Sequence, residues 1–134
     1  MSETLSRYAP QARAVFRIAV ALLFIQHGTQ KLLGFPAAAQ PMPLNGLFIT
    51  GGLLEIFGGI AIAIGLFTRP VAFVLSGMMA VAYFMFHSPA NFYPALNGGD
   101  AAVLFCFAFL YLVFAGPGAW SVDGRIGQER PATA

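Results

Sequence analysis

Long apolar stretches alternate with short, more polar connections along the chain. Four such stretches cover about residues 14–34, 47–66, 70–87 and 100–115. Each approaches the roughly 20 residues with which an α-helix crosses a bilayer. The pattern predicts an all-α, polytopic membrane protein, a bundle of four transmembrane helices. We expect residues 1–134 to form a single membrane domain, with flexible ends at 1–12 and 124–134.

The composition indicates the same surroundings. Hydrophobic residues make up 58% of the chain and charged residues only 9%, whereas a soluble globular domain carries about 25% charged residues. The short connections leave no room for such a domain, so the lipid bilayer is the first expected partner. The 7 Lys and Arg residues are too few and too dispersed to form a patch that tracks phosphates. Binding to nucleic acid is therefore not expected.

The arginines all fall on one side of the predicted spans. They occur around the start of the first span, between the second and third, and after the fourth: Arg7, Arg13, Arg17, Arg69, Arg125 and Arg130. The two other connections contain no arginine. Because cytoplasmic connections are enriched in Lys and Arg, we expect both termini to lie in the cytoplasm.

A carboxylate interrupts the second apolar stretch. Glu55 lies near the middle of residues 47–66, between the pairs Gly51-Gly52 and Gly58-Gly59. A charged group costs several kcal/mol at this depth, and intramembrane acids commonly mark functional sites. At helical spacing the glycines lie about one turn before and after Glu55, so another helix can approach closely. We expect Glu55 to point into the bundle.

With the N-terminus inside, most polar residues of the spans fall in the outer half of the bilayer. His27 and Lys31 lie there one helical turn apart, and the second span reaches Glu55 after about two turns. We interpret these three residues as candidate catalytic residues. The candidate ligand-binding residues come from the other spans and from the end of span one: Gln30, Tyr83, His87, Asn97, Asp100, Phe107 and Tyr111. Such a set would suit an amphipathic aromatic ligand that enters from the outer leaflet.

Each of the polar residues also has a purely structural interpretation. Glu55 could form an interhelical hydrogen bond or ion pair, and His27 could be an interhelical donor. Lys31 either pairs with Glu55 or extends to the lipid headgroups. His87 could cap its helix, and Asp100 could stabilise the dipole at the start of its helix.

The sequence offers few ligands for a redox centre. Cys106 is the single cysteine, so a disulfide centre within the chain is not expected, and the sequence has no metal-binding cysteine pattern. His27 and His87 fall at different depths of the bundle, which argues against haem. We therefore expect no haem, metal or disulfide centre, and a quinone or a partner would have to move electrons.

Several short motifs follow one another in order: His27-Gly28-Thr29-Gln30-Lys31-Leu32, Glu55-Ile56-Phe57-Gly58-Gly59, Gly65-Leu66-Phe67-Thr68-Arg69, Asn97-Gly98-Gly99-Asp100 and Gly116-Pro117-Gly118-Ala119-Trp120-Ser121-Val122-Asp123. With these motifs the chain resembles the DoxX family of membrane proteins, from the first span to Asp123. The resemblance implies a compact four-helix bundle in the bacterial inner membrane. The residues that match the family motifs are His27, Lys31, Glu55, Arg69, Asn97, Gly98, Gly99 and Asp100.

The resemblance also implies expectations about activity. The family takes its name from subunits linked to quinone-dependent sulfur oxidation, and other members are associated with membrane oxidoreductase complexes that handle thiol and superoxide stress. The first hypothesis is therefore a quinone-linked oxidoreductase subunit with a redox partner protein. In it, Lys31 or His27 hydrogen-bonds a quinone carbonyl, and Glu55 takes or gives the accompanying proton.

Two other functions stay open at this point. The protein could be a non-enzymatic subunit that assembles or anchors a redox or stress-response complex. A small carrier is a weaker hypothesis, because the inner half lacks polar groups for a route across the bilayer. The glycine-rich faces would also permit a homodimer.

Overall fold

The computed structural model describes residues 2–129, and all regular structure within this range is helical. The helices are α1 (Ser2–Ser6), α2 (Ala9–Leu33), α3 (Gly46–Leu53), η1 (Leu54–Gly58), α4 (Gly59–Ile64), α5 (Thr68–Ala82), η2 (Tyr83–His87), α6 (Pro94–Asn97), α7 (Asp100–Ala115) and α8 (Val122–Glu129). Two of them, η1 and η2, are single π-helical turns. The fold class expected from the sequence, a polytopic all-α protein, is confirmed for this part of the chain.

Three continuous helical segments are long and apolar enough to cross a membrane. They are Ala9–Leu33, Gly46–Ile64 and Thr68–His87, and the apolar helix α7 is shorter. The bounds of α7 are those that the sequence predicts, whereas α2 begins earlier than residue 14. Helices also form in both ends that we expected to be flexible: α1 and the start of α2 lie within 1–12, and most of α8 lies within 124–134. Residues 130–134 of that second end lie outside the described range.

Local sequence explains where these helices begin and end. The Asn45 side chain accepts a hydrogen bond from the Phe48 amide at 3.0 Å, which caps the start of α3. Gly34 ends α2 and Gly65 ends α4, both with a left-handed backbone that glycine adopts without strain. The turn after Gly65 leads directly into α5, so the second and third spans run in opposite directions from this turn.

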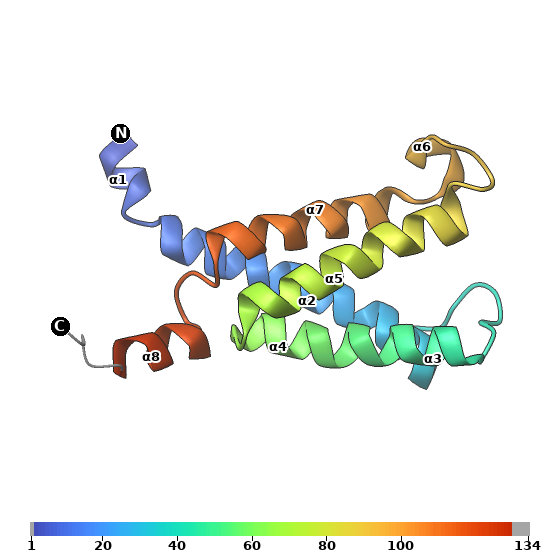
Figure 1. The fold of residues 1–134 in the computed structure, drawn as a ribbon, viewed down its shortest axis with the longest axis horizontal. Coiled ribbons are helices and arrows are strands. Elements are labelled where there is room, and N and C mark those ends of the chain that lie inside the picture. The colour runs from blue at the N-terminus through green and yellow to red at the C-terminus, as the bar shows by residue number, and fades with distance from the viewer. Residues whose placement is uncertain (1, 130–134) are drawn as a thin grey trace.

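The helices form two pairs that are closely joined at one end of the molecule (Figure 1). Helix α2 packs along α3, η1 and α4, while α5 packs along α7. Helices α1 and α8 and the α4–α5 turn lie at the joined end. Toward the other end, which carries α6 and the connection from α2 to α3, the two pairs diverge. The space between them at this end becomes the candidate site.

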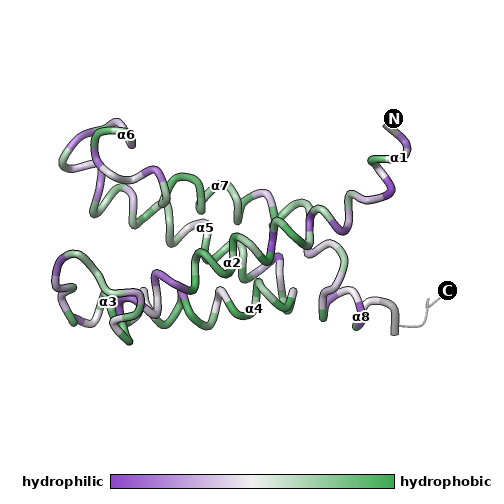
Figure 2. The backbone as a smooth tube through the Cα atoms, turned by 180° about the vertical axis from the view of Figure 1, so that it is seen from behind, coloured by the Kyte–Doolittle hydropathy of each residue, from purple (hydrophilic) through white to green (hydrophobic). Residues whose placement is uncertain are grey.

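The core lies where the two pairs meet. It contains Phe24 of α2, Ile62 of α4, Leu75 of α5 and Phe109 of α7, all nearly inaccessible to solvent. The ring of Phe24 contacts Phe109 edge-on, with centroids 4.8 Å apart. Hydrophobic residues make up most of the long helices (Figure 2), and many of the large ones are exposed on the outside of the bundle. Exposed apolar surface over whole helices is the arrangement that a lipid solvent requires.

Arginine side chains bind backbone carbonyls at the joined end. The buried Arg17 donates hydrogen bonds to the carbonyls of Pro117, Ala119 (3.2 Å) and Trp120 (2.9 Å). Arg13 bonds the Ala115 carbonyl at 2.5 Å, and Arg69 bonds those of Val113 and Phe114, both at 2.7 Å. We call Arg13, Arg17 and Arg69 the carbonyl clamp. The sequence suggested only a topological role for these arginines, but they also hold the end of α7 and the segment after it.

Candidate functional site

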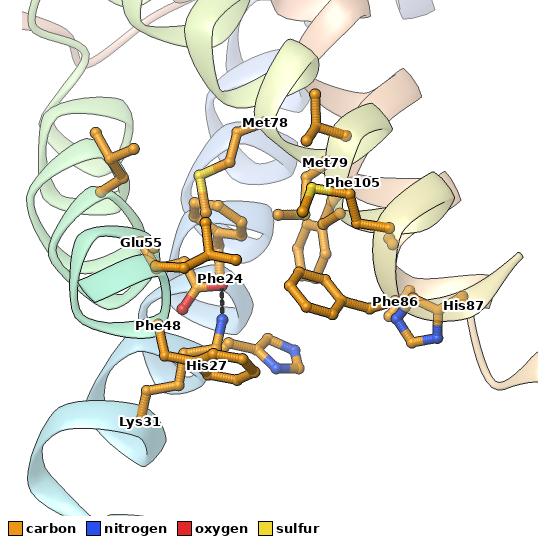
Figure 3. Close-up of a pocket in the computed structure, with 18 of the residues that line it drawn as sticks. Phe24, His27, Lys31, Phe48, Glu55, Met78, Met79, Phe86, His87 and Phe105 are labelled. Atoms are coloured by element: carbon orange, nitrogen blue, oxygen red, sulfur yellow. Dashed lines mark hydrogen bonds and ion pairs between the residues drawn. The ribbon is translucent and has the colours of Figure 1, made fainter. Parts of the chain in front are cut away.

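A cavity of about 490 Å³ lies between the two helix pairs where they diverge. Its walls come from α2, α3, η1, α5, η2 and α7, and most of them are apolar (Figure 3). The larger apolar side chains of the lining include Phe24, Phe48, Met78, Met79, Phe86 and Phe105. Four ionisable side chains join them: His27, Lys31, Glu55 and His87. The candidate catalytic residues therefore all reach one cavity.

Lys31 and Glu55 form an ion pair across the contact between α2 and η1. The Lys31 ammonium donates to Oε1 of Glu55, as the dashed line in Figure 3 marks. The Glu55 side chain is only 3% exposed and that of Lys31 is 21% exposed. In this structure Lys31 thus pairs with the carboxylate instead of extending to the headgroups. The second carboxylate oxygen, Oε2, is buried and has no hydrogen-bond partner.

Close helix packing places this pair. A methyl group on Gly28 of α2 would lie 2.7 Å from the carbonyl oxygen of Gly52 and 2.9 Å from Cβ of Glu55. Only glycine permits so close an approach of two backbones. In each of the two glycine pairs around Glu55, one glycine faces α2 and the other faces α5. Gly52 and Gly59 face α2, while Gly51 and Gly58 face α5. The expected role of these glycines in close helix approach therefore applies to two neighbours at once.

The π-helical turns lie beside the cavity. Turn η1 contains Glu55, and turn η2 contains Tyr83 and His87. An inserted π turn rotates the following residues relative to an uninterrupted α-helix, and such turns occur frequently at functional sites. Neither turn was expected from the sequence.

His27 and His87 lie on different walls. The ring of His27 is half-buried beside Lys31 and contacts Phe105 edge-on, with centroids 5.7 Å apart. His87 lies across the cavity from the ion pair in Figure 3. Its Nδ1 is 3.2 Å from the carbonyl oxygen of Asn97. The cavity therefore has polar groups on two sides and apolar walls between them.

Two predicted ligand-binding residues order the connection before α7 and are not among the cavity-lining residues. The Tyr83 hydroxyl donates to the Phe92 carbonyl and accepts from Nδ2 of Asn97 at 3.1 Å. Asn97 also donates to the Asn91 carbonyl at 2.6 Å and accepts from the Gly99 amide at 2.7 Å. These bonds fold residues 88–99 over the end of α5 and η2, close to His87.

The remaining candidates, Gln30, Asp100, Phe107 and Tyr111, are also absent from the cavity lining. Phe107 is 62% and Tyr111 50% exposed, and Tyr111 packs edge-on against Phe16 with centroids 5.6 Å apart. Phe107 and Tyr111 share a face of α7 that points away from the cavity. Phe105, on the adjacent face of α7, lines the cavity instead. The apolar walls were not identified from the sequence, because lipid-facing and cavity-facing Phe and Met look alike in a membrane span.

Among the described residues, no group of three or more His, Cys, Asp and Glu side chains could hold a metal ion. The Ser76 hydroxyl donates a hydrogen bond to the Cys106 carbonyl oxygen at 2.8 Å, and its oxygen lies 3.6 Å from Sγ of Cys106. This polar contact joins α5 to α7.

The chain is similar over most of its length to several bacterial proteins. The chain is 42% identical to an uncharacterized protein of Haemophilus influenzae, over 90% of this chain and 95% of that protein. It is 34% identical to the inner membrane protein YqjF of Escherichia coli, with 86% of this chain and 92% of YqjF covered. The inner membrane protein YphA of the same organism is 32% identical, with 87% and 91% covered. No solved structure matches the chain.

These relatives and the apolar helices identify a multi-pass protein of the inner membrane. The sequence model of the DoxX family matches residues 12–88. That range is more than half of the chain and contains His27, Lys31, Glu55 and His87 of the cavity. The chain therefore belongs to the DoxX family.

Proposed function

We propose that this protein is a membrane-embedded subunit of a quinone-linked oxidoreductase system, with the quinone ring held in the cavity beside Lys31 and Glu55. The observation that carries the proposal is an ion pair with a buried carboxylate in the wall of a mostly apolar cavity of about 490 Å³. Cavities that bind small molecules span roughly 300–1,000 Å³ and combine apolar walls with a few placed polar groups.

The donors of the site fit a ring that carries oxygen atoms. An ammonium group has three N–H donors, and Glu55 uses one of those on Lys31. Another can donate to a carbonyl oxygen that enters the cavity. Glu55 Oε2 has no hydrogen-bond partner, so the carboxylate has unused capacity to accept from a hydroxyl.

The two polar sides of the cavity fit a ring with oxygen atoms at opposite edges. His87 lies opposite the ion pair, with Phe48, Phe86 and Phe105 between them along the walls. Aromatic side chains pack well against a flat ring in edge-on or offset arrangements. A quinone ring could therefore meet polar groups at both ends and apolar contacts over its faces.

A bound quinone would supply two-electron, two-proton chemistry, with electrons exchanged with a redox partner protein. The residues of this chain supply binding and proton transfer. Lys31 orients the oxygen by hydrogen bonding, and the Lys31–Glu55 pair can hold a proton beside that oxygen. The apolar walls keep most water away and strengthen these electrostatic interactions.

Ligand-dependent stability of the purified protein tests the proposal. A ligand that binds only the folded state raises the unfolding temperature in a saturable way. We expect this behaviour with a quinone that lacks an apolar tail, and with its quinol, in wild-type protein in detergent. The shift should be much smaller in Glu55→Gln and Lys31→Met, and unchanged in Glu3→Gln, a matched carboxylate-to-amide control at an exposed position.

Absence of any shift in wild type, together with a large loss of stability in Glu55→Gln, would contradict the proposal. It would make the ion pair structural and favour a subunit that assembles or anchors a complex without binding a ligand.

Activity in membranes provides a second test. In cells without the wild-type copy, folded Glu55→Gln protein should lose quinone-dependent turnover, because the proton-holding carboxylate is gone. The amount of folded variant in the membrane fraction is the control. Unchanged turnover would exclude a role for Glu55 in proton transfer.

A further inference from the structure

A second hollow of about 400 Å³ lies on the outside of the bundle, between α2 and α7. We call it the tail groove. Its apolar walls are Phe16, Val20 and Leu23 of α2 and Leu104 and Ala108 of α7. Leu23 is 53% and Leu104 71% exposed, so the tail groove opens to the surface that lipid covers.

The tail groove and the cavity share part of their walls. His27, Ala101 and Phe105 line both hollows. The edge-on contact between His27 and Phe105 lies at this shared wall. Rotation of the His27 or Phe105 side chain would therefore connect the inner cavity with the lipid-facing surface, without any movement of a helix.

The length and direction of the tail groove suit an extended chain. From His27 to Phe16, eleven residues of helix rise about 16 Å at 1.5 Å per residue. The tail groove runs along α2 from the cavity toward the joined end of the bundle. It thus begins at the polar groups of the cavity and continues into the apolar middle of the span.

From this continuity we infer that the tail groove holds the apolar tail of the ligand whose ring occupies the cavity. The inference rests on the proposed function and narrows its ligand to a lipid-soluble quinone with a prenyl or alkyl chain. A packed helix is a poorer occupant. Helix contacts in membranes favour small residues, whereas large side chains such as Phe16, Leu23 and Leu104 form the rims of this groove.

Binding of two quinones with the same ring, one without a tail and one with a linear alkyl chain, tests the inference. The affinity of each is measured by equilibrium dialysis against purified protein in one detergent. We expect the tail to tighten binding to wild type about tenfold, since several methylene groups gain packed contacts. Ala108→Phe fills the groove outside the cavity, so the tail should add little there while the tail-free quinone binds as before.

The matched control is Val74→Phe, on an exposed position of α5 that lines neither hollow. It should keep the full gain from the tail. An equal gain in affinity from the tail in wild type and Ala108→Phe, or no gain in wild type, would overturn the inference that the tail groove holds the tail. The proposed function would stay intact. If neither quinone bound the wild-type protein, the inference and the proposed function would both be wrong.

A photoreactive group at the end of the tail gives a measurement that does not depend on a variant. Cross-links should concentrate on residues 16–23 and 104–108, and excess unlabelled tailed quinone should suppress them. Cross-links that occur on the exposed face of α5 as often as on these two segments would show that the tail lies in detergent or lipid, which overturns the inference.

Discussion

The contact between Lys31 and Glu55 joins an ammonium to a carboxylate where little water reaches either group. Removing two charges from water is costly, and their attraction compensates only when the partners stay together. Removal of one partner leaves the other uncompensated in an apolar wall. Each residue therefore needs the other to balance its charge in the folded protein, whether or not a ligand occupies the cavity.

This reasoning predicts a large coupling between the two residues. Lys31→Met should lower the free energy of unfolding by about 2–3 kcal/mol, because Glu55 stays buried without its partner. Adding Glu55→Gln should recover most of the loss, since the double variant has no unpaired charge. Unfolding of both single variants and the double variant in one detergent gives the coupling energy. Additive losses would show that the two side chains do not interact.

At the residue scale, the sequence predicted the polar groups of the candidate site better than its apolar walls. His27, Lys31 and Glu55 stood out because polar groups are rare in membrane spans, and the structure brings all three to one cavity. Phe107 and Tyr111 lie one helical turn apart on α7, but the side of the bundle that they meet depends on how α7 packs. The rotation of α7 about its own axis is set by tertiary contacts such as that of Phe105 with Phe24, whose ring centroids are 5.2 Å apart.

At the scale of elements, the helical spans followed from the sequence because apolar length is the main requirement for crossing a bilayer. The π turns did not follow, since the same residues could continue an α-helix. Which hydrogen-bond pattern forms depends on contacts with residues of other helices. The close contact of α2 with α3 and η1 is one such constraint, and it depends on Gly28.

Gly28→Ala should therefore destabilise the bundle by about 1–3 kcal/mol through overpacking. The added methyl would meet the Gly52 carbonyl oxygen, a backbone atom that cannot rotate away. Gly77→Ala in α5 is the matched control, because nothing lies within 4 Å of the added methyl. It should be neutral or stabilising by up to about 1 kcal/mol. Equal effects of the two substitutions on thermal unfolding would contradict close packing at Gly28.

The attachment of α8 depends on a different kind of contact. The Asp123 carboxylate accepts hydrogen bonds from the amides of Phe67 and Thr68, both at 2.8 Å, at the start of α5. Partial burial alone raises the pKa of Asp123, but these amide bonds and the charge of Arg17 outweigh it and hold the pKa below its usual range. A carboxylate at the N-terminal end of a helix is also stabilised by the helix dipole.

Asp123 should therefore stabilise the fold above about pH 4, its range in an unfolded chain, and lose this effect as the pH falls through its lower folded pKa. Asp123→Asn should be less stable than wild type at pH 7, since one amide oxygen replaces two acceptors. Its stability should also change less between pH 5 and about pH 3. Unfolding midpoints of both proteins across this range provide the measurement, and identical pH profiles would contradict the contribution of Asp123.

At the scale of the whole molecule, the bundle is fixed at one end and open at the other. The carbonyl clamp and Asp123 tie α2, α5, α7 and α8 together at the joined end. The cavity lies where no comparable network joins the two helix pairs within the described residues. Motion that admits a ligand should therefore concentrate in the diverging half, where the π turns are located.

The charge distribution gives this shape an expected orientation in the membrane. All five arginines of the described range lie at the joined end: in the turn between α1 and α2, near the starts of α2 and α5, or on α8. Lys31 is the cation of the diverging half within that range. Cytoplasmic ends of membrane proteins are enriched in Arg and Lys. We therefore expect the joined end and both termini in the cytoplasm, and the cavity in the outer half of the bilayer.

Single cysteines introduced on a Cys106→Ala background test this orientation. Ala39→Cys and Ala90→Cys lie in the two exposed connections of the diverging end, and both should react with a membrane-impermeant maleimide added to the periplasmic side. A fluorescent protein fused after Ala134 should fold and fluoresce, as it does in the cytoplasm, while an alkaline phosphatase at that position should be inactive. Labelling only after the inner membrane is opened would reverse the bundle. The cavity would then take its ligand from the cytoplasmic leaflet, and a redox partner would have to be sought on the opposite face.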